Sequence, residues 1–155
     1  TTDDRKVTVA AKEREAKLGV PTAAIELADG TIITSKTSDL LGASAALLLN
    51  VLKYLGDVDH DTHLISPEAI GPIQELKVKY LGGKNPRLHT DEVLIALSIS
   101  ALTDSNARKA LDQLPKLKGC QVHTTVMLSN VDINTFKKLG IDLTSEPIIK
   151  GKRLK

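Results

Sequence analysis

The segment KTSDLLGASAALLLNVLKYLG, residues 36–56, decides the fold of this chain. Apolar residues recur in it at helical spacing from Leu40 to Leu55, and most of the remaining positions are Gly, Ala or Ser rather than charged residues. A helix that is apolar nearly all round is buried among other elements, and its small residues let neighbouring backbones approach closely. We therefore predict that the helix 40–55 forms the centre of the core, with Leu48 and Leu52 almost fully buried.

Segments with strand periodicity lie on both sides of this helix. Residues 23–27 and 31–35 alternate around Ala28-Asp29-Gly30, which is the pattern of a β-hairpin. Further along, a strand over 120–128, a short helix capped by Asp132 and an extended return over 141–149 predict a β-α-β unit with parallel strands. Other helices are predicted at 3–18, 72–81, 91–102 and 105–114. The prediction is an α/β or α+β domain, with a small mixed sheet packed by a buried Leu-rich helix and at least three further helices.

Composition restricts the class of protein. The 155 residues suffice for one domain, and 41% hydrophobic with 26% charged residues is typical of a globular chain. Aromatic residues make up only 2%, so the chain lacks the ring platforms on which single-stranded nucleic acid stacks. The net charge of +2 comes from a basic tail, 148–155, because without its four basic residues 17 Lys and Arg stand against 19 Asp and Glu. No nucleic-acid partner is predicted.

Cysteine usage and hydropathy predict a cytoplasmic setting. Cys120 is the single cysteine, so no intrachain disulfide forms. The longest apolar stretch, Leu40 to Leu49, has ten residues, whereas about twenty are needed to span a bilayer. No signal-peptide pattern opens the chain, and no membrane partner is predicted.

The residues before the central helix are candidates for anion binding. Gly30, Lys36 and Thr37 have the spacing of a phosphate loop, but Ser35 stands where the second glycine belongs, and the intervening residues read as a strand. A simpler interpretation is that Lys36, Thr37 and Ser38 stand at the positive end of the helix, where free N–H groups and hydroxyls favour an anion. The alternative is that Ser38 or Asp39 only caps the helix and Lys36 is solvated.

A second loop carries the same chemistry. Asn85, Arg87, His89 and Thr90 lead into the helix 91–102, and Arg87 could grip a carboxylate or phosphate with its planar guanidinium. They could equally cap that helix and hold a long loop in place. If both helices start at the same rim, the two loops form one anion site, whereas starts at opposite ends leave two unrelated caps.

Metal binding is not predicted. Asp57, Asp59, Asp61 and Glu68 have the spacing of calcium ligands, but Thr62 stands where that loop needs Gly, so a solvated loop is expected. His60 and His63 lack a third ligand at suitable spacing. His63 and His89 remain candidates for proton transfer.

Several stretches are similar to a known family: residues 36–50, HLISP (63–67), 85–101, 114–123 and 136–147. They resemble the C-terminal region of a bacterial family of uncharacterised proteins, domain-of-unknown-function family 1846. The resemblance implies a cytoplasmic bacterial protein whose members carry a larger N-terminal α/β domain. The chain is then the C-terminal part of a two-domain protein, in agreement with its first residue, Thr1, and with the thin apolar stripe of a peripheral charged helix within 1–19.

Two hypotheses of function follow. In the first, the domain supplies half of a site for a phosphorylated or carboxylated molecule, with Lys36, Thr37, Ser38, Arg87 and His89 holding the anion and the N-terminal domain completing it. In the second, it is a structural or oligomerisation domain with no ligand of its own, and its apolar helices pack against other copies. Residues gathered in one concavity favour the first hypothesis, and a large exposed Leu, Ile and Val patch favours the second. The sequence identifies neither a substrate nor a cofactor.

Overall fold

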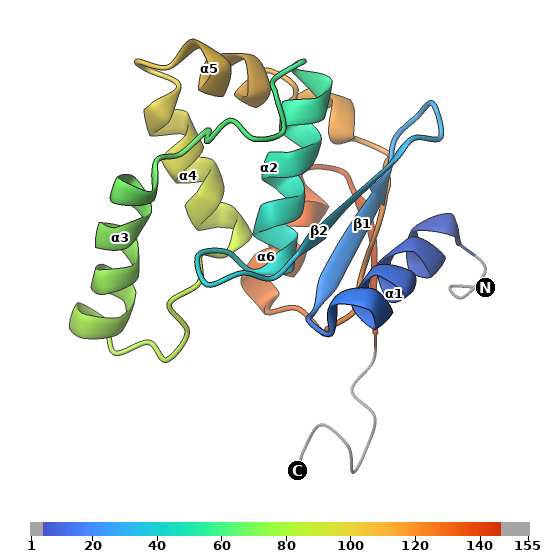
Figure 1. The fold of residues 1–155 in the computed structure, drawn as a ribbon, viewed down its shortest axis with the longest axis horizontal. Helices are drawn as coiled ribbons and strands as arrows, with labels where there is room; N and C mark the ends of the chain where they lie inside the picture. The colour runs from blue at the N-terminus through green and yellow to red at the C-terminus, as the bar shows by residue number, and fades with distance from the viewer. Residues whose placement is uncertain (1–4, 147–155) are drawn as a thin grey trace.

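The computed structural model describes residues 5–146 and shows a four-stranded mixed sheet with helices on both faces (Figure 1). The basic tail predicted at 148–155 lies outside the described residues. The strands are β1 (Thr22–Glu26), β2 (Ile32–Lys36), β3 (Gln121–Thr124) and β4 (Asp142–Ser145), in the order β2-β1-β3-β4. β1 is antiparallel to both β2 and β3, whereas β3 and β4 are parallel. The predicted α/β class, the hairpin and the β-α-β unit are confirmed.

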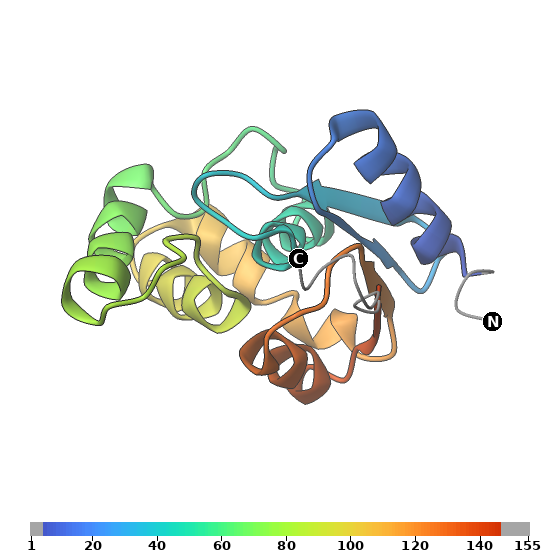
Figure 2. The same ribbon diagram turned by 90° about the horizontal axis from the view of Figure 1, so that it is seen from below.

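Residues 5–146 form six α-helices besides the sheet. They are α1 (Lys6–Leu18), α2 (Ala43–Leu55), α3 (Pro67–Glu75), α4 (Thr90–Ser100), α5 (Ser105–Leu111) and α6 (Asn130–Lys138), with a π-helical turn η2 (Leu76–Tyr80) after α3 and a 3₁₀ turn η3 (Leu114–Leu117) after α5. α1 covers one face of the sheet, and the remaining helices lie on the other side (Figures 1 and 2).

Strand alternation sets these two layers. In β1, Ala23 and Ile25 point into the large core shared with α2, whereas Ala24 points to the opposite face and contacts the smaller cluster beneath α1. Successive strand residues face opposite sides, so a strand that is buried on both faces reads as a nearly continuous apolar run. Ala24 is small, which lets α1 approach the sheet closely.

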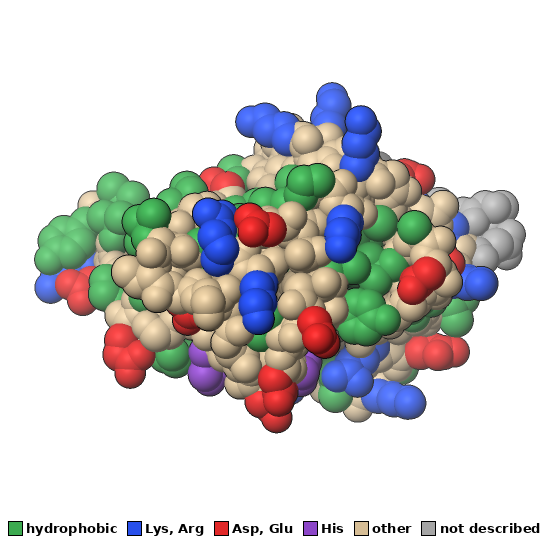
Figure 3. Space-filling view, turned by 90° about the horizontal axis from the view of Figure 1, so that it is seen from above, with side chains coloured by type: hydrophobic (Ala, Val, Ile, Leu, Met, Phe, Trp, Pro, Cys, Tyr) green, Lys and Arg blue, Asp and Glu red, His purple; other side chains and the backbone are tan. Residues whose placement is uncertain are grey.

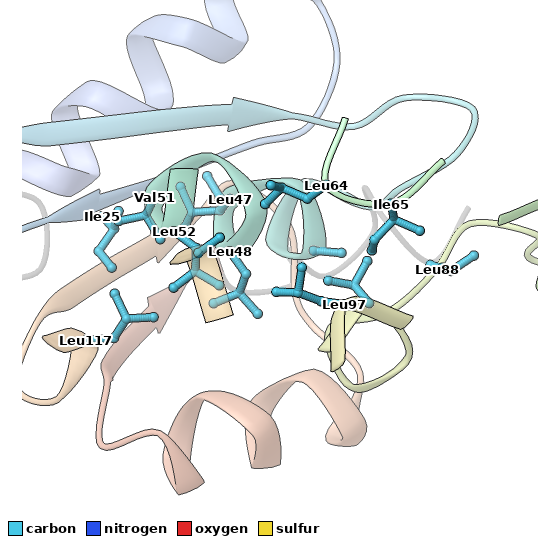
Figure 4. Close-up of a cluster of buried hydrophobic side chains, with 14 of the residues drawn as sticks. Ile25, Leu47, Leu48, Val51, Leu52, Leu64, Ile65, Leu88, Leu97 and Leu117 are labelled. Carbon is cyan, nitrogen blue, oxygen red and sulfur yellow. The ribbon is translucent and has the colours of Figure 1, made fainter. Parts of the chain in front are cut away.

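α2 packs between the sheet and α4 and α5. Its Leu47, Leu48, Val51 and Leu52 are fully buried, and they meet side chains from β1, α4 and η3 in one cluster (Figure 4). Burial of one Leu, Val or Ile side chain contributes about 1.5–3 kcal/mol.

The start of α2 differs from the prediction. The helix begins at Ala43, not at Leu40, because the backbone before it pairs with the loop that precedes α4. The Leu88 amide donates to the Leu40 carbonyl at 3.0 Å, and the Gly42 amide donates to the Leu88 carbonyl at 3.3 Å. The Ser38 hydroxyl accepts from the Leu40 and Leu41 amides and stabilises a turn there, so it does not cap the helix.

The sheet face beneath α1 carries a polar cluster. His123 on β3 is fully buried, with Nδ1 2.7 Å from the Thr144 hydroxyl of β4, to which Arg5 also donates. Its Nε2 lies 3.4 Å from the Glu146 carboxylate without hydrogen-bond geometry. Burial lowers the pKa of His123; Lys12 and Arg5 act in the same direction, and Glu146 opposes them. Burial therefore favours the neutral imidazole in the folded state.

Replacement of Leu48 by Ala should strongly destabilise the fold. Leu48 is fully buried, so its truncation removes apolar contact and leaves a cavity at the centre of the core. We expect the free energy of unfolding to fall by roughly 2–5 kcal/mol in urea titrations. Leu102→Ala is the matched control, because Leu102 is 81% exposed. Equal effects of the two substitutions would show that α2 is not the centre of the core.

Stability should decrease as the pH falls below about 6.5, the ordinary pKa of histidine. The pKa of His123 is lowered in the folded state, so the unfolded chain binds the proton first as the pH falls. Proton binding stabilises the unfolded chain relative to the folded one. The contribution of His123 is complete above that pH and is lost toward acid. Urea titrations between pH 5 and pH 8 measure this slope. His123→Gln should reduce the slope, and the same change at the exposed His60 should leave it unaltered.

Candidate functional site

A cavity of about 230 Å³ opens where α2 and α4 begin. Its walls come from segments that are far apart in the sequence: the first turn of α2, the loop before α4, and the loop between β3 and α6 with the first turn of α6. Pro21 and Thr37, at the sheet end of β1 and β2, complete the lining. The polar residues that line it are Thr37, Ser44, Asn85, Arg87, His89, Ser129 and Asp132. The two helix starts therefore share one rim, which was one of the two arrangements that the sequence left open.

The first turn of α2 has no cap. Gly42 stands at the N-cap and has no side chain to accept from the helix. The amides of Ala43, Ser44 and Ala45 donate to no described residue, although all three residues are buried and line the cavity. Free amides at a helix start carry partial positive charge and attract anions.

Ser44 adds an unpaired hydroxyl to these amides. The residue is only 3% exposed, and its Oγ has no hydrogen-bond partner within residues 5–146. Buried polar groups are normally hydrogen-bonded, and one left unpaired costs about 1–3 kcal/mol. The cavity wall at α2 thus offers several hydrogen-bond donors that have no acceptor among residues 5–146.

The guanidinium of Arg87 is bound to the protein through Nε, and its two Nη groups have no partner among the described residues. Its Nε donates to the Ser38 carbonyl at 2.5 Å, and the Asn85 side chain accepts from its backbone amide at 3.0 Å. Lys77 from η2 donates to the Arg87 carbonyl at 2.5 Å and pairs with Glu92 at 2.8 Å. The two Nη groups of Arg87 make no hydrogen bond to the described residues, so they remain available to a ligand.

Asp132 joins α6 to the start of α4. Its Oδ1 accepts from the Thr90 amide at 2.9 Å and from the Thr90 hydroxyl at 2.7 Å, and its Oδ2 lies 3.4 Å from Nδ1 of His89. The side chain is almost fully buried, yet its charge lies at the positive end of α4. Asp132 therefore caps α4, a helix that starts 42 residues earlier in the chain.

The prediction that Asp132 caps its own helix was wrong. The Ser129 hydroxyl accepts from the Asp132 amide and caps α6, which starts at Asn130. The spacing Ser129-x-x-Asp132 is a capping signal that could have placed the helix start correctly. No local pattern could show that the carboxylate reaches Thr90, because that contact depends on the packing of α6 against α4.

The other candidate residues lie elsewhere. Lys36 is exposed at the end of β2 and does not line the cavity. Ser38 and His63 line a second cavity of about 210 Å³ beside α2, so the structure separates His63 from His89. Thr37, Arg87 and His89 are thus the predicted site residues that share one cavity.

The polar groups of the acidic loop after α2 form hydrogen bonds within the loop and with Lys53. The Asp59 carboxylate accepts from the Asp61 amide, and the Lys53 ammonium donates to the carbonyls of His60 and Thr62. Burial lowers the pKa of Lys53, and the nearby Asp61 and Asp59 oppose that shift. Among residues 5–146 no group of three or more His, Cys, Asp or Glu side chains could hold a metal ion.

In the part of the chain that the structure describes, no helix combines the length and the apolar character needed to cross a membrane.

The sequence matches one family model along nearly its whole length. The model is described as the C-terminal part of a domain of unknown function, DUF1846, and it covers residues 3–154. The resemblance seen in the sequence is therefore confirmed.

Relatives from bacteria extend well beyond this chain. A UPF0371 protein of Corynebacterium urealyticum is 60% identical over 147 residues, which is 95% of this chain and 30% of the relative. A UPF0371 protein of Corynebacterium diphtheriae is 57% identical over 97% of the chain, and one of Streptococcus pyogenes is 47% identical over 99%. The chain spans about 30% of the length of these relatives, whose names state no activity. By the family match and by these identities, the chain belongs to the DUF1846 family of uncharacterised bacterial proteins, as its C-terminal domain.

Proposed function

We propose that the cavity at the starts of α2 and α4 binds the anionic group of a small molecule, a phosphate or a carboxylate. The observation that carries this proposal is the buried Ser44 hydroxyl, which has no partner within the described residues, beside three free amides. An anion at this point would accept from all of them at once. It would also lie at the positive end of α2.

Side chains around the turn complete the proposed site. The free Nη groups of Arg87 offer a planar pair of donors suited to carboxylate or phosphate oxygens. Thr37 adds a hydroxyl, and His89 adds an imidazole that Asp132 holds in position. Lys36 and Ser38 have no place in this site, because neither lines the cavity. Proton transfer is proposed for His89 alone, because His63 is exposed in a different cavity.

The size of the cavity limits the ligand. Pockets for drug-sized molecules measure about 300–1,000 Å³, and this cavity has about 230 Å³. It therefore suits an anionic head group rather than a whole dinucleotide.

We propose that this cavity is one half of a larger ligand site. Its outer wall is formed by exposed residues, including Met127 and Ser129, and it opens to the surface. In the relatives about 70% of the polypeptide lies outside the matched region. We propose that the part of the protein preceding this domain closes the cavity and supplies contacts to the rest of the ligand.

Ser44→Ala should weaken binding of inorganic phosphate without weakening the fold. Calorimetric titration should show affinity lower by about tenfold or more, because a hydrogen bond to a charged oxygen is lost. The free energy of unfolding should stay the same or rise by up to about 1 kcal/mol, since the hydroxyl has no partner and Ala favours helix.

Ser98→Ala is the matched control for this measurement. Ser98 lies on the exposed face of α4, where its hydroxyl donates to the Leu94 carbonyl of the same helix. Phosphate affinity should not change in this variant. A Ser44→Ala protein that binds phosphate as the unmodified chain does, or no phosphate binding by the unmodified chain, would contradict the anion site.

Self-association is a second candidate function, and the outer face of α4 favours it. Ile95, Ile99 and Leu102 follow one another at helical spacing and are 61%, 63% and 81% exposed. Leu76, Val78 and Tyr80 on η2, and Leu81 just after it, add exposed apolar side chains. On the face drawn in Figure 3, hydrophobic side chains gather at the end of the molecule where α3 lies. Large exposed apolar side chains at helical spacing favour an interface.

Ile99→Glu should separate the copies if this surface joins them. Light scattering coupled to size exclusion should then show a dimer for the unmodified chain at high protein concentration and a monomer for the variant, because the glutamate would be desolvated in the interface. Val9→Glu, at a position 45% exposed on α1, should leave the mass unchanged. A monomer at every concentration would exclude self-association of this chain.

A further inference from the structure

The side chain of Lys77 connects η2 to the loop before α4. Lys77 is the half-buried residue of η2, whereas the other four are exposed. Its side chain is 12% exposed, and its ammonium donates to the Arg87 carbonyl at 2.5 Å and to the Glu92 carboxylate at 2.8 Å. The same Glu92 oxygen accepts from the His89 amide at 2.8 Å. Lys77 therefore holds the backbone of a loop that lines the cavity, although Lys77 itself does not line it.

The backbone of Lys77 holds the other end of this loop. The Gly83 amide donates to the Lys77 carbonyl at 2.7 Å, and a Cβ at Gly83 would lie only 2.9 Å from that oxygen. Gly82 just before it has a φ of 72°, a left-handed conformation that favours glycine. The chain thus turns back tightly after η2, and Lys77 contacts residues 83 and 87 at the two ends of the returning segment.

Few other contacts hold η2 in place. None of its residues is buried, and Ile70 is the buried residue of the preceding α3. At the end of α3, Gln74 donates to the Asp39 carbonyl at 3.1 Å. Segments with few buried apolar contacts open at low free energy. The position of η2 can therefore respond to the loop that Lys77 holds.

We propose that Lys77 is a positioning residue of the anion site and that it couples η2 energetically to the cavity. This inference rests on the proposed function and adds to it how the Arg87 side of the site is held. The Arg87 guanidinium is fixed through Nε on the Ser38 carbonyl, and its backbone is fixed by the Lys77 ammonium. With both ends fixed, the Nη groups keep one orientation before a ligand arrives, and preorganised donors bind more tightly than mobile ones.

Lys77→Met should weaken the binding of inorganic phosphate by about three- to tenfold, the range expected for coupled residues in contact. Methionine keeps much of the length of the side chain but cannot donate to the Arg87 carbonyl. Calorimetric titration measures the affinity, and thermal unfolding checks that the variant is folded. Lys79→Met is the matched control, because it removes the same charge from η2 at a side chain that is 67% exposed. It should leave the affinity unchanged.

A double-mutant cycle with Arg87→Ala shows whether Lys77 acts through Arg87. Without the guanidinium, loss of the Lys77 ammonium should have no further effect on phosphate affinity. An equal loss in both backgrounds would overturn the inference, because Lys77 would then act through its charge or through the stability of the fold. If Arg87→Ala binds phosphate too weakly for titration, hydrogen exchange decides.

Hydrogen exchange at the end of η2 measures the coupling from the other side. The amides of Leu81 and Gly83 donate to the carbonyls of Leu76 and Lys77. Coupling is reciprocal, so saturating phosphate should slow the exchange of these two amides in the unmodified chain by about three- to tenfold. Phosphate should not slow them in Lys77→Met. NMR spectra of the two proteins with and without phosphate give these rates.

The outcomes separate this inference from the anion site itself. If the unmodified chain binds phosphate but Lys77→Met binds it equally well, Lys77 does not position the site, and the anion site stands. Exchange at Leu81 and Gly83 that ignores phosphate would likewise overturn the coupling alone. If the unmodified chain binds no phosphate, the proposed function fails and this inference fails with it.

Discussion

The buried carboxylate of Asp132 is the contact on which the geometry of the cavity depends. It connects the first turn of α6 to the start of α4 by two hydrogen bonds to Thr90. The pairing of Leu40 and Gly42 with Leu88 then fixes the start of α2 against the same loop. These hydrogen bonds hold α6, the start of α4 and the start of α2 in fixed positions relative to one another. Hydrogen bonds to a buried carboxylate need a defined donor geometry, so the two bonds from Thr90 fix how α6 and α4 lie relative to each other.

The same contacts explain why α2 and α4 differ at their starts. α4 receives a carboxylate from another part of the chain, and its first turn is complete. α2 follows Gly42 as its N-cap and receives no capping side chain from the described part of the chain, although its first turn is also buried. The fold thus caps one helix with a distant residue and leaves the first amides of the neighbouring helix without a partner among residues 5–146.

The amino-acid pattern was sufficient for the sheet, the hairpin and the helix order, since these follow from local periodicity and turn residues. It placed Leu48 and Leu52 in the core for the same reason. It failed at the start of α2, because Leu40 and Leu41 continue the apolar period while their backbone pairs with Leu88. The pattern also did not show that Lys36 lies away from the cavity. Nor did it show that Asp132 caps α4, because that contact forms only when α6 packs against α4. Residues near a helix start can be recognised locally, but the partner that a buried carboxylate finds cannot.

The open first turn of α2 has a consequence for the lifetime of the protein. Buried donors without partners lower the stability of the empty domain, and any ligand that satisfies them binds the folded chain but not the unfolded one. Folding and ligand concentration are then linked by mass action. If an anion binds at this turn as proposed, domains without it would be degraded faster in a cell than saturated ones, because proteases remove the unfolded fraction. The amount of folded protein would thereby follow the supply of the ligand without a separate regulator.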